Sequence, residues 1–209
     1  MRVALITNEF RKKQRMPKTP LAYRVAYKIS SRRIYRPLVK LVKSLEPQIV
    51  GVDIGSGCGL AAELIVNFFD RLYLIDLDEG LARDAKKRLR FHPNVEVIVA
   101  DARSIPLPDA FADLVYFFDS LHHIPRPEKA LFEAIRILKP KGTLAIFDLD
   151  GRQLFAKFLS LLERAFGLHS KPLSSQQLCS LLSESNFSIL DVEVDLFGML
   201  NLYAVKEEV

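Results

Sequence analysis

A glycine-rich stretch holds the residue types best suited to ligand binding in this chain of 209 residues. Residues 55–59 read GSGCG, after an apolar run at 49–54 and before a helical pattern that begins at Leu60. Glycine accepts positive φ and lets a ligand approach the backbone closely. The first turn of a helix leaves N–H groups unpaired and carries a partial positive charge. The stretch therefore predicts a strand, a tight turn and a helix that hold a polar or anionic part of a nucleotide-like ligand.

Dinucleotides are one of two ligand classes that bind such a turn, and the glycine spacing of this chain fits them poorly. A dinucleotide-binding turn has a third glycine at the sixth position of its motif, where this chain has Leu60. A hydride-transfer enzyme is therefore disfavoured. The glycines are also compatible with a tight turn that binds no ligand, so residues elsewhere in the chain must decide.

Acidic residues follow three further predicted strands. Asp76 lies near the end of a strand at 71–77 and 21 positions after Gly55, where a carboxylate can accept two hydrogen bonds from a ribose. Asp101 follows a strand at 95–100, and Asp119 follows a strand at 113–118. Ligands of open α/β sheets bind beyond the carboxyl ends of the strands. We therefore expect the glycine turn and these three aspartates to converge at one edge of a sheet.

The order of strands and helices predicts the fold. Helical patterns at 60–68, 79–89 and 128–138 alternate with strands, of which the fifth spans 143–147. Two more strands, at 187–194 and 200–205, would form an antiparallel pair. The chain is thus predicted to be α/β, with a doubly wound seven-stranded sheet that is mostly parallel and has a C-terminal antiparallel strand.

Four sequence stretches carry a family resemblance. They read VDIGSGCG at 52–59, DAFADLV at 109–115, LHHIPRP at 121–127 and AIRILKPKGTL at 134–144. Together they resemble the class I S-adenosylmethionine-dependent methyltransferases, in the small-molecule branch that includes quinone- and sterol-type enzymes. The resemblance covers about residues 48 to 150. It departs from the family at Lys141, where a second glycine is usual.

The resemblance implies a Rossmann-like methyltransferase fold and S-adenosylmethionine as cofactor. It also implies that Asp101 faces the adenine amino group while the backbone of Ala102 contacts the ring, although Asp101 could be a plain turn residue. Asp78, at the end of the same strand as Asp76, could cap the helix at 79–89. The predicted cofactor-binding residues are Asp53, Gly55, Ser56, Gly57, Gly59, Asp76, Leu77, Asp101, Ala102 and Asp119.

The catalytic residues are not assigned. Methyl transfer from a sulfonium needs alignment and desolvation, and it needs a base only when the acceptor atom carries a proton. Asp119, His122 and His123 are the candidates, although His123 could simply pack against a helix and hold its turn. No metal ligand is assigned either. A magnesium ion near Asp119, Asp148 and Asp150, as in catechol-type methyltransferases, is an alternative.

Charge divides the chain into two parts. Residues 1–50 contain 13 Lys and Arg against Glu9 and Glu46, whereas the whole chain has a net charge of +5. The basic part could contact an anionic substrate, nucleic acid or an acidic surface, or could be an ordinary solvated helix face. We interpret residues 1–47 as a basic lid or substrate segment and residues 48–209 as the methyltransferase domain, within one globular unit.

The remaining expectations concern acceptor and compartment. An apolar helical stretch at 154–166 favours a small or lipid-like acceptor, and its aromatic spacing is more typical of a core than of a cofactor site. Transfer to RNA or protein, and a non-catalytic S-adenosylmethionine-binding protein, are the alternatives. Two cysteines, no apolar run near ~18 residues and no secretory signal at the N-terminus predict a cytoplasmic protein without a membrane span. The oligomeric state is not predicted.

Overall fold

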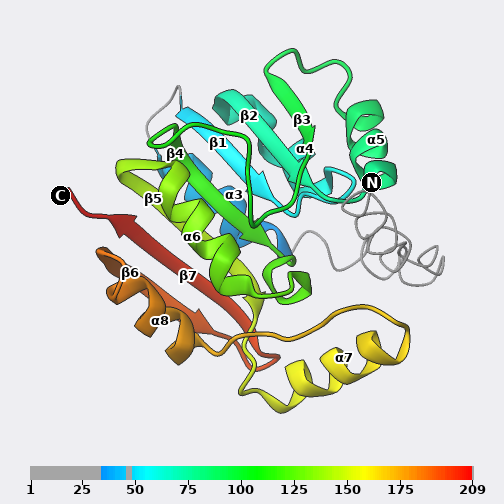
Figure 1. Cartoon of the computed structure of the whole chain (residues 1–209), viewed down its shortest axis with the longest axis vertical. Coiled ribbons are helices and arrows are strands. Elements are labelled where there is room, and N and C mark those ends of the chain that lie inside the picture. Colours follow the sequence, from blue (N-terminus) through cyan, green and yellow to red (C-terminus); the bar gives the residue numbers. More distant parts are fainter. Residues whose placement is uncertain (1–33, 46–48, 209) are drawn as a thin grey trace, which may run out of the picture.

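Seven strands form one sheet in the computed structural model, which describes residues 34–45 and 49–208. The strand order is β3-β2-β1-β4-β5-β7-β6 (Figure 1). The strands β1 to β5 run parallel, and β7 is antiparallel to both of its neighbours. Their bounds are β1 Ile49–Ile54, β2 Phe69–Asp76, β3 Val95–Val99, β4 Ala112–Phe118, β5 Leu138–Leu149, β6 Phe187–Val194 and β7 Met199–Lys206. The predicted fold class is confirmed.

Helices cover both faces of this sheet. Side chains of α3, α4 and α5 pack in one apolar cluster, and those of α6 and α8 pack in the other. Successive strand residues point to opposite faces, so Val115 of β4 joins the second cluster while Leu114 joins the first. The bounds are α3 Arg36–Ser44, α4 Leu60–Ile65, η1 Val66–Phe68, α5 Glu79–Arg88, η2 Leu121–His123, α6 Pro127–Ile137, α7 Leu154–Ala165 and α8 Ser175–Ser183.

The sequence has a helical pattern over residues 21–45 with a break at Pro37, and the structure starts the helix α3 at Arg36. Pro37 lies in its first turn, where the missing N–H costs no intrahelical hydrogen bond. Leu38 and Val42 are buried against the sheet, so this end of the basic segment belongs to the core of the domain. The part of this helical pattern at 21–33, and the segment before it, lie outside the described residues.

The fifth strand starts earlier than predicted. The sequence predicts a helix as far as 138 and a strand from 143, but Leu138 already pairs with Ala112 of β4. The register shifts between Ala112 and Leu114, and Lys141 adopts φ +63°, a conformation that is unusual for a residue with a side chain. The residue types at this position are typical of a turn. The irregular pairing accommodates them, so the strand continues without a break.

The helix α7 corrects the expectation that the aromatic residues at 154–166 form a core. Its buried residues are Ala156, Ser160 and Glu163, whereas the large apolar side chains of the stretch are exposed. The helix follows the carboxyl end of β5 and lies apart from the sheet in Figure 1. Among the helices of residues 34–45 and 49–208, none is long and apolar enough to cross a membrane.

Candidate active site

The glycine turn between β1 and α4 depends on left-handed backbone conformations. Gly55, Gly57 and Gly59 have φ values of +76°, +55° and +76°. The backbone N–H groups of Gly55 and Ser56 both donate to the carbonyl of Ile75, at 2.8 and 3.1 Å. A Cβ atom on Gly55 would lie 2.6 Å from Cβ of Ser120, so only glycine fits there. The turn is therefore held between the ends of β2 and β4.

Asp76 connects the end of β2 to the glycine turn. Its Oδ2 accepts a hydrogen bond of 2.7 Å from the N–H of Gly57, and its Oδ1 accepts one of 2.8 Å from the N–H of Asp78. Burial raises the pKa of Asp76, and these two hydrogen bonds oppose that shift. A Cβ atom on Gly57 would meet nothing within 4 Å among the described residues. The turn thus presents open space next to a carboxylate whose oxygens can each accept a second hydrogen bond.

Asp53 is a buried carboxyl group behind the same turn. It neighbours Tyr116 in the pairing of β1 with β4. Burial raises the pKa of Asp53 to about 8, against a lowering effect of the nearby Tyr116 hydroxyl. Neither carboxylate oxygen has a hydrogen-bond partner among the described residues, nor does the buried hydroxyl of Ser56 in the turn. These buried polar atoms around the glycine turn are therefore available to form hydrogen bonds with a polar ligand.

Asp101 lies at the carboxyl end of β3, beside Asp76. The N–H of Ala100 donates to the carbonyl of Asp76 at 3.0 Å, which joins the two strand ends. Both carboxylate oxygens of Asp101 contact the guanidinium of Arg103, at 2.9 and 2.6 Å, and these hydrogen bonds lower its pKa. The predicted adenine contact would therefore share Asp101 with Arg103. Ala102 follows, packed against the sheet core.

Asp119 and Ser120 fix the end of β4. Asp119 has φ +52°, and its N–H donates to the carbonyl of Phe147 on β5 at 2.8 Å. The hydroxyl of Ser120 donates to the carbonyl of Ile54 on β1 at 2.7 Å. The four predicted segments therefore lie at one edge of the sheet, as the positions of the strand ends require. The ligand contacts of Leu77, Asp119 and the other predicted cofactor-binding residues stay predictions.

A second cluster of polar groups lies where η2 meets α7. Nδ1 of the buried His122 is hydrogen-bonded to Asp148 of β5, and the N–H of His122 donates to the same carboxylate at 3.0 Å. Burial disfavours the charged form of His122, but Asp148 and the other carboxylates raise its pKa well above the ordinary value. Its Nε2 faces Oε2 of Glu163 at 3.7 Å. His123 faces the other oxygen of Glu163.

Sequence reasoning missed Glu163, which comes from a different helix and 41 positions after His122. No motif surrounds it, and its position on the buried side of α7 becomes evident only once the helix is seen to expose its apolar residues. The alternative magnesium set is not brought together as a whole. Asp119 and Asp148 lie close to His122, but Asp150 accepts backbone hydrogen bonds from Arg152 and Ser175 at 2.8 and 3.1 Å.

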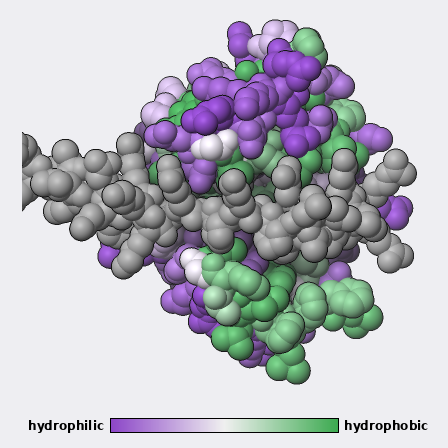
Figure 2. All heavy atoms as spheres, turned by 90° about the vertical axis from the view of Figure 1, so that its right-hand side faces the viewer, coloured by the Kyte–Doolittle hydropathy of each residue, from purple (hydrophilic) through white to green (hydrophobic). Residues whose placement is uncertain are grey.

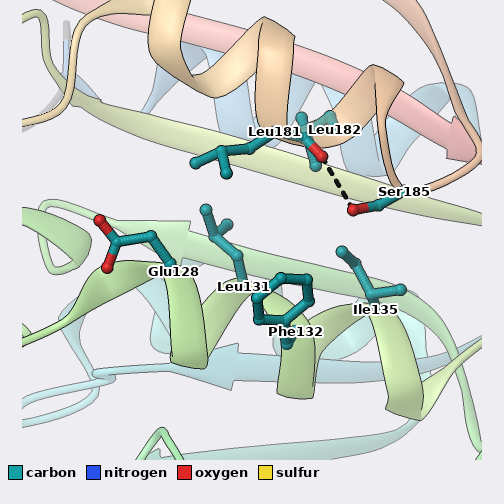
Figure 3. A pocket seen from close by; sticks show the side chains of 7 residues that line it. All are labelled: Glu128, Leu131, Phe132, Ile135, Leu181, Leu182 and Ser185. Atoms are coloured by element: carbon teal, nitrogen blue, oxygen red, sulfur yellow. Dashed lines mark hydrogen bonds between the residues drawn. The ribbon is translucent and has the colours of Figure 1, made fainter.

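A shallow hollow lies away from this edge of the sheet, and none of the predicted site residues line it. It runs between α6 and α8, and Figure 3 shows mostly apolar side chains around it. The hydroxyl of Ser185 there donates to the carbonyl of Leu181 at 2.8 Å. Its lining residues are Glu128, Leu131, Phe132, Ile135, Leu181, Leu182 and Ser185.

The part of the chain that holds the glycine turn and the acidic strand ends matches a known protein family. Residues 52–146 match the family described as methyltransferase domain. This stretch contains the glycine turn, Asp76, Asp101 and Asp119. Residues 52–146 thus match a methyltransferase domain, and the expected cofactor, S-adenosylmethionine, agrees with that match.

Similar proteins agree with this assignment. The chain is 28% identical over 160 residues to a Mycobacterium tuberculosis protein named as a probable S-adenosylmethionine-dependent methyltransferase, covering 75% of this chain and 55% of that protein. It is 34% identical over 112 residues to a ubiquinone/menaquinone biosynthesis C-methyltransferase of Rickettsia bellii, covering 50% of this chain and 45% of that protein. The chain therefore spans about half the length of these relatives.

Solved structures share the fold. The YcgJ protein of Bacillus subtilis superposes with a TM-score of 0.72 at 15% identity, over 85% of this chain and 100% of that one. An S-adenosylmethionine-dependent methyltransferase of Mesorhizobium loti superposes with a TM-score of 0.70 at 17% identity, over 83% of this chain and 98% of that one. At these identities the likeness shows the fold alone.

Proposed function

We propose that the chain transfers a methyl group from S-adenosylmethionine to a small, lipid-like acceptor. The observation that carries the donor side is the hydrogen bond between Gly57 and Asp76, which sets a carboxylate next to open space at the glycine turn. Ribose hydroxyls would donate to Asp76, and the adenine would lie by Asp101 and Ala102. The bound cofactor supplies an activated methyl group on a sulfonium, and the chain supplies alignment and exclusion of water.

The acceptor side rests on the apolar surface of α7. Phe158, Leu161 and Phe166 are each more than half exposed, and Figure 2 shows apolar side chains gathered over this part of the molecule. An exposed group of large apolar side chains marks a place where a protein, a membrane or an apolar ligand binds, and an apolar ligand is the case proposed here. The relatives named for ubiquinone, menaquinone or demethylmenaquinone methylation support a quinone-type acceptor in particular.

The basic segment 1–47 is proposed as a lid over the acceptor. Its described end packs in the core but starts near the acceptor side, because the ring of Tyr35 stacks on Phe118 at a centroid distance of 4.7 Å. Phe118 directly precedes Asp119, so the segment reaches the same edge of the sheet. The rest of the segment lies outside the described residues. No general base is assigned, because His122 has both ring nitrogens facing carboxylates and the acceptor atom is not defined.

Labelled S-adenosylmethionine tests the proposal. The full chain would be incubated with a cell extract that has been separated into lipid, other small-molecule, RNA and protein fractions. We expect label in the lipid or small-molecule fraction, and much less of it from a variant with Asp76→Ala when the cofactor is below saturation. Label in RNA or protein would replace the proposed acceptor. Cofactor binding without transfer to any fraction would indicate a binding protein that is not an enzyme.

A further inference from the structure

His122 and His123 present matching nitrogens to one carboxylate. Nδ1 of His122 is hydrogen-bonded to Asp148, and Nδ1 of His123 lies 2.6 Å from the carbonyl oxygen of His169. With Nδ1 acting as donor in both rings, each Nε2 becomes a ligand atom once it carries no proton. Both Nε2 atoms face Glu163, one toward Oε2 at 3.7 Å and the other toward Oε1 at 3.9 Å.

Neither Nε2 atom forms a hydrogen bond with Glu163. Both nitrogen–oxygen distances exceed hydrogen-bond length. Oε2 of Glu163 is buried without a hydrogen-bond partner among the described residues, and the residue is only 6% exposed. A buried carboxylate oxygen without a donor costs free energy, because it has lost water and gained no partner. The nearby hydroxyl of Ser170 is likewise buried without a partner.

One cation between the three side chains would satisfy all of them. The ligand atoms of His122, His123 and Glu163 lie within 4.8 Å of one another. Around a tetrahedral zinc ion, with bonds of about 2.0–2.2 Å, neighbouring ligand atoms lie roughly 3.3 Å apart. The two nitrogen–oxygen distances of 3.7 and 3.9 Å need only small side-chain movements to reach that spacing.

We infer that His122, His123 and Glu163 bind one first-row divalent cation, with zinc as the cation that fits the donor set best. Two imidazoles and one carboxylate suit zinc, whereas magnesium prefers oxygen ligands. The hydrogen bonds of both Nδ1 atoms supply the outer contacts that orient metal-bound histidines. The side chain of His123 is 28% exposed, which leaves an entry path and an open fourth position.

The site would attach α7 to the edge of the sheet. Glu163 belongs to α7, whereas the two histidines lie in η2, shortly after the end of β4. The adjoining segment is already tied to η2, since the N–H of Lys171 donates to the carbonyl of His122 at 2.9 Å. A cation here would hold the apolar helix beside the predicted methyl-transfer site. The inference does not depend on the proposed acceptor, nor on any turnover.

Zinc binding by the full chain, free of any purification tag, tests the inference. After treatment with a chelator and dialysis, zinc would be titrated against a colorimetric competitor and bound zinc measured by atomic emission. We expect one zinc per chain and a higher melting temperature with zinc. Cobalt should give the visible absorption of a four-coordinate ion, and magnesium should not compete.

Glu163→Gln removes the charge and keeps the shape of the side chain, so zinc affinity should fall by at least about tenfold. Glu184→Gln, on the exposed end of α8, is the matched control and should bind zinc like the wild type. His123→Asn, at a partly exposed position, provides a second loss-of-ligand variant if Glu163→Gln does not fold. Wild-type protein that binds no stoichiometric zinc, or a folded ligand variant that binds it as tightly as the control, would overturn the inference.

Discussion

The backbone N–H of Gly57 donates a 2.7 Å hydrogen bond to Oδ2 of Asp76, and this contact joins the glycine turn after β1 to the acidic end of β2. The hydrogen bond therefore links the two features from which we predict a nucleoside-binding edge. A carboxylate that braces the turn is also positioned beside the space that the turn leaves open.

Replacing Asp76 should separate binding from folding. Asp76→Ala removes a charged hydrogen-bond acceptor for the ribose, so S-adenosylmethionine affinity measured by calorimetry should fall roughly 10- to 100-fold. Asp78→Ala is the matched control, because the Asp78 side chain caps α5 by accepting from Gly80 and Leu81. It should cost about 1 kcal/mol of stability and leave cofactor affinity unchanged. Equal affinities in the two variants would contradict the role of Asp76.

Gly55 should be the least replaceable residue of the turn. Gly55→Ala places a Cβ atom 2.6 Å from Cβ of Ser120 at a φ of +76°. Gly167→Ala has a similar φ of +82° but meets nothing within 4 Å, so it measures the backbone cost alone, about 1–2 kcal/mol. Urea unfolding should show a further loss of about 1–3 kcal/mol for Gly55→Ala. Equal losses would show that the Ser120 contact relaxes freely.

Asp53 should make stability fall as pH rises. Its folded-state pKa is raised from 3.8 to about 8. Between these values the unfolded chain releases the proton and the folded chain keeps it, so the unfolded state is favoured progressively, by about 1.4 kcal/mol per pH unit. Below pH 4 both states bind the proton, and this effect vanishes.

Asp53→Asn removes that titration. Relative to the wild type, the variant should become steadily more stable from about pH 4 to pH 8 in urea unfolding without cofactor, by several kcal/mol in total. Above pH 8 the difference should level off. A difference that does not change with pH would mean that Asp53 is ionised in the folded protein.

The strand ends and the glycine turn could be predicted from the sequence because their signals are local. The apolar run before Gly55 and the 21-residue spacing to Asp76 reflect one βαβ unit. The capping box that starts α8, between Ser174 and Gln177, is likewise a local pattern of residue types.

Other features depend on contacts between distant segments. The pairing of Leu138 with Ala112 extends β5 into residues whose own pattern suits a helix end. The apolar residues of α7 have the spacing of a core helix, yet the helix turns Glu163 inward to meet His122. Tertiary context decides which face of such a helix is buried, and the sequence period alone does not.

The apolar face of α7 should be dispensable for folding. Phe158→Ser and Leu161→Ser change exposed side chains, so the free energy of unfolding should stay within about 0.5 kcal/mol of the wild type. Binding of the apolar dye 8-anilinonaphthalene-1-sulfonate should weaken, because the two side chains form part of the exposed apolar surface. Phe91→Ser, a change to an exposed phenylalanine far from α7 in sequence, should leave dye binding unchanged. A large loss of stability in the α7 variants would mean that this face is covered.

A crystal structure of the full chain with S-adenosylmethionine tests the central claim most directly. We predict the ribose hydroxyls on Asp76, the adenine beside Asp101 and Ala102, and the methionine portion at the turn formed by residues 55–59. Crystals in which the cofactor binds elsewhere, or in which this edge of the sheet stays empty at saturating cofactor, would contradict the account.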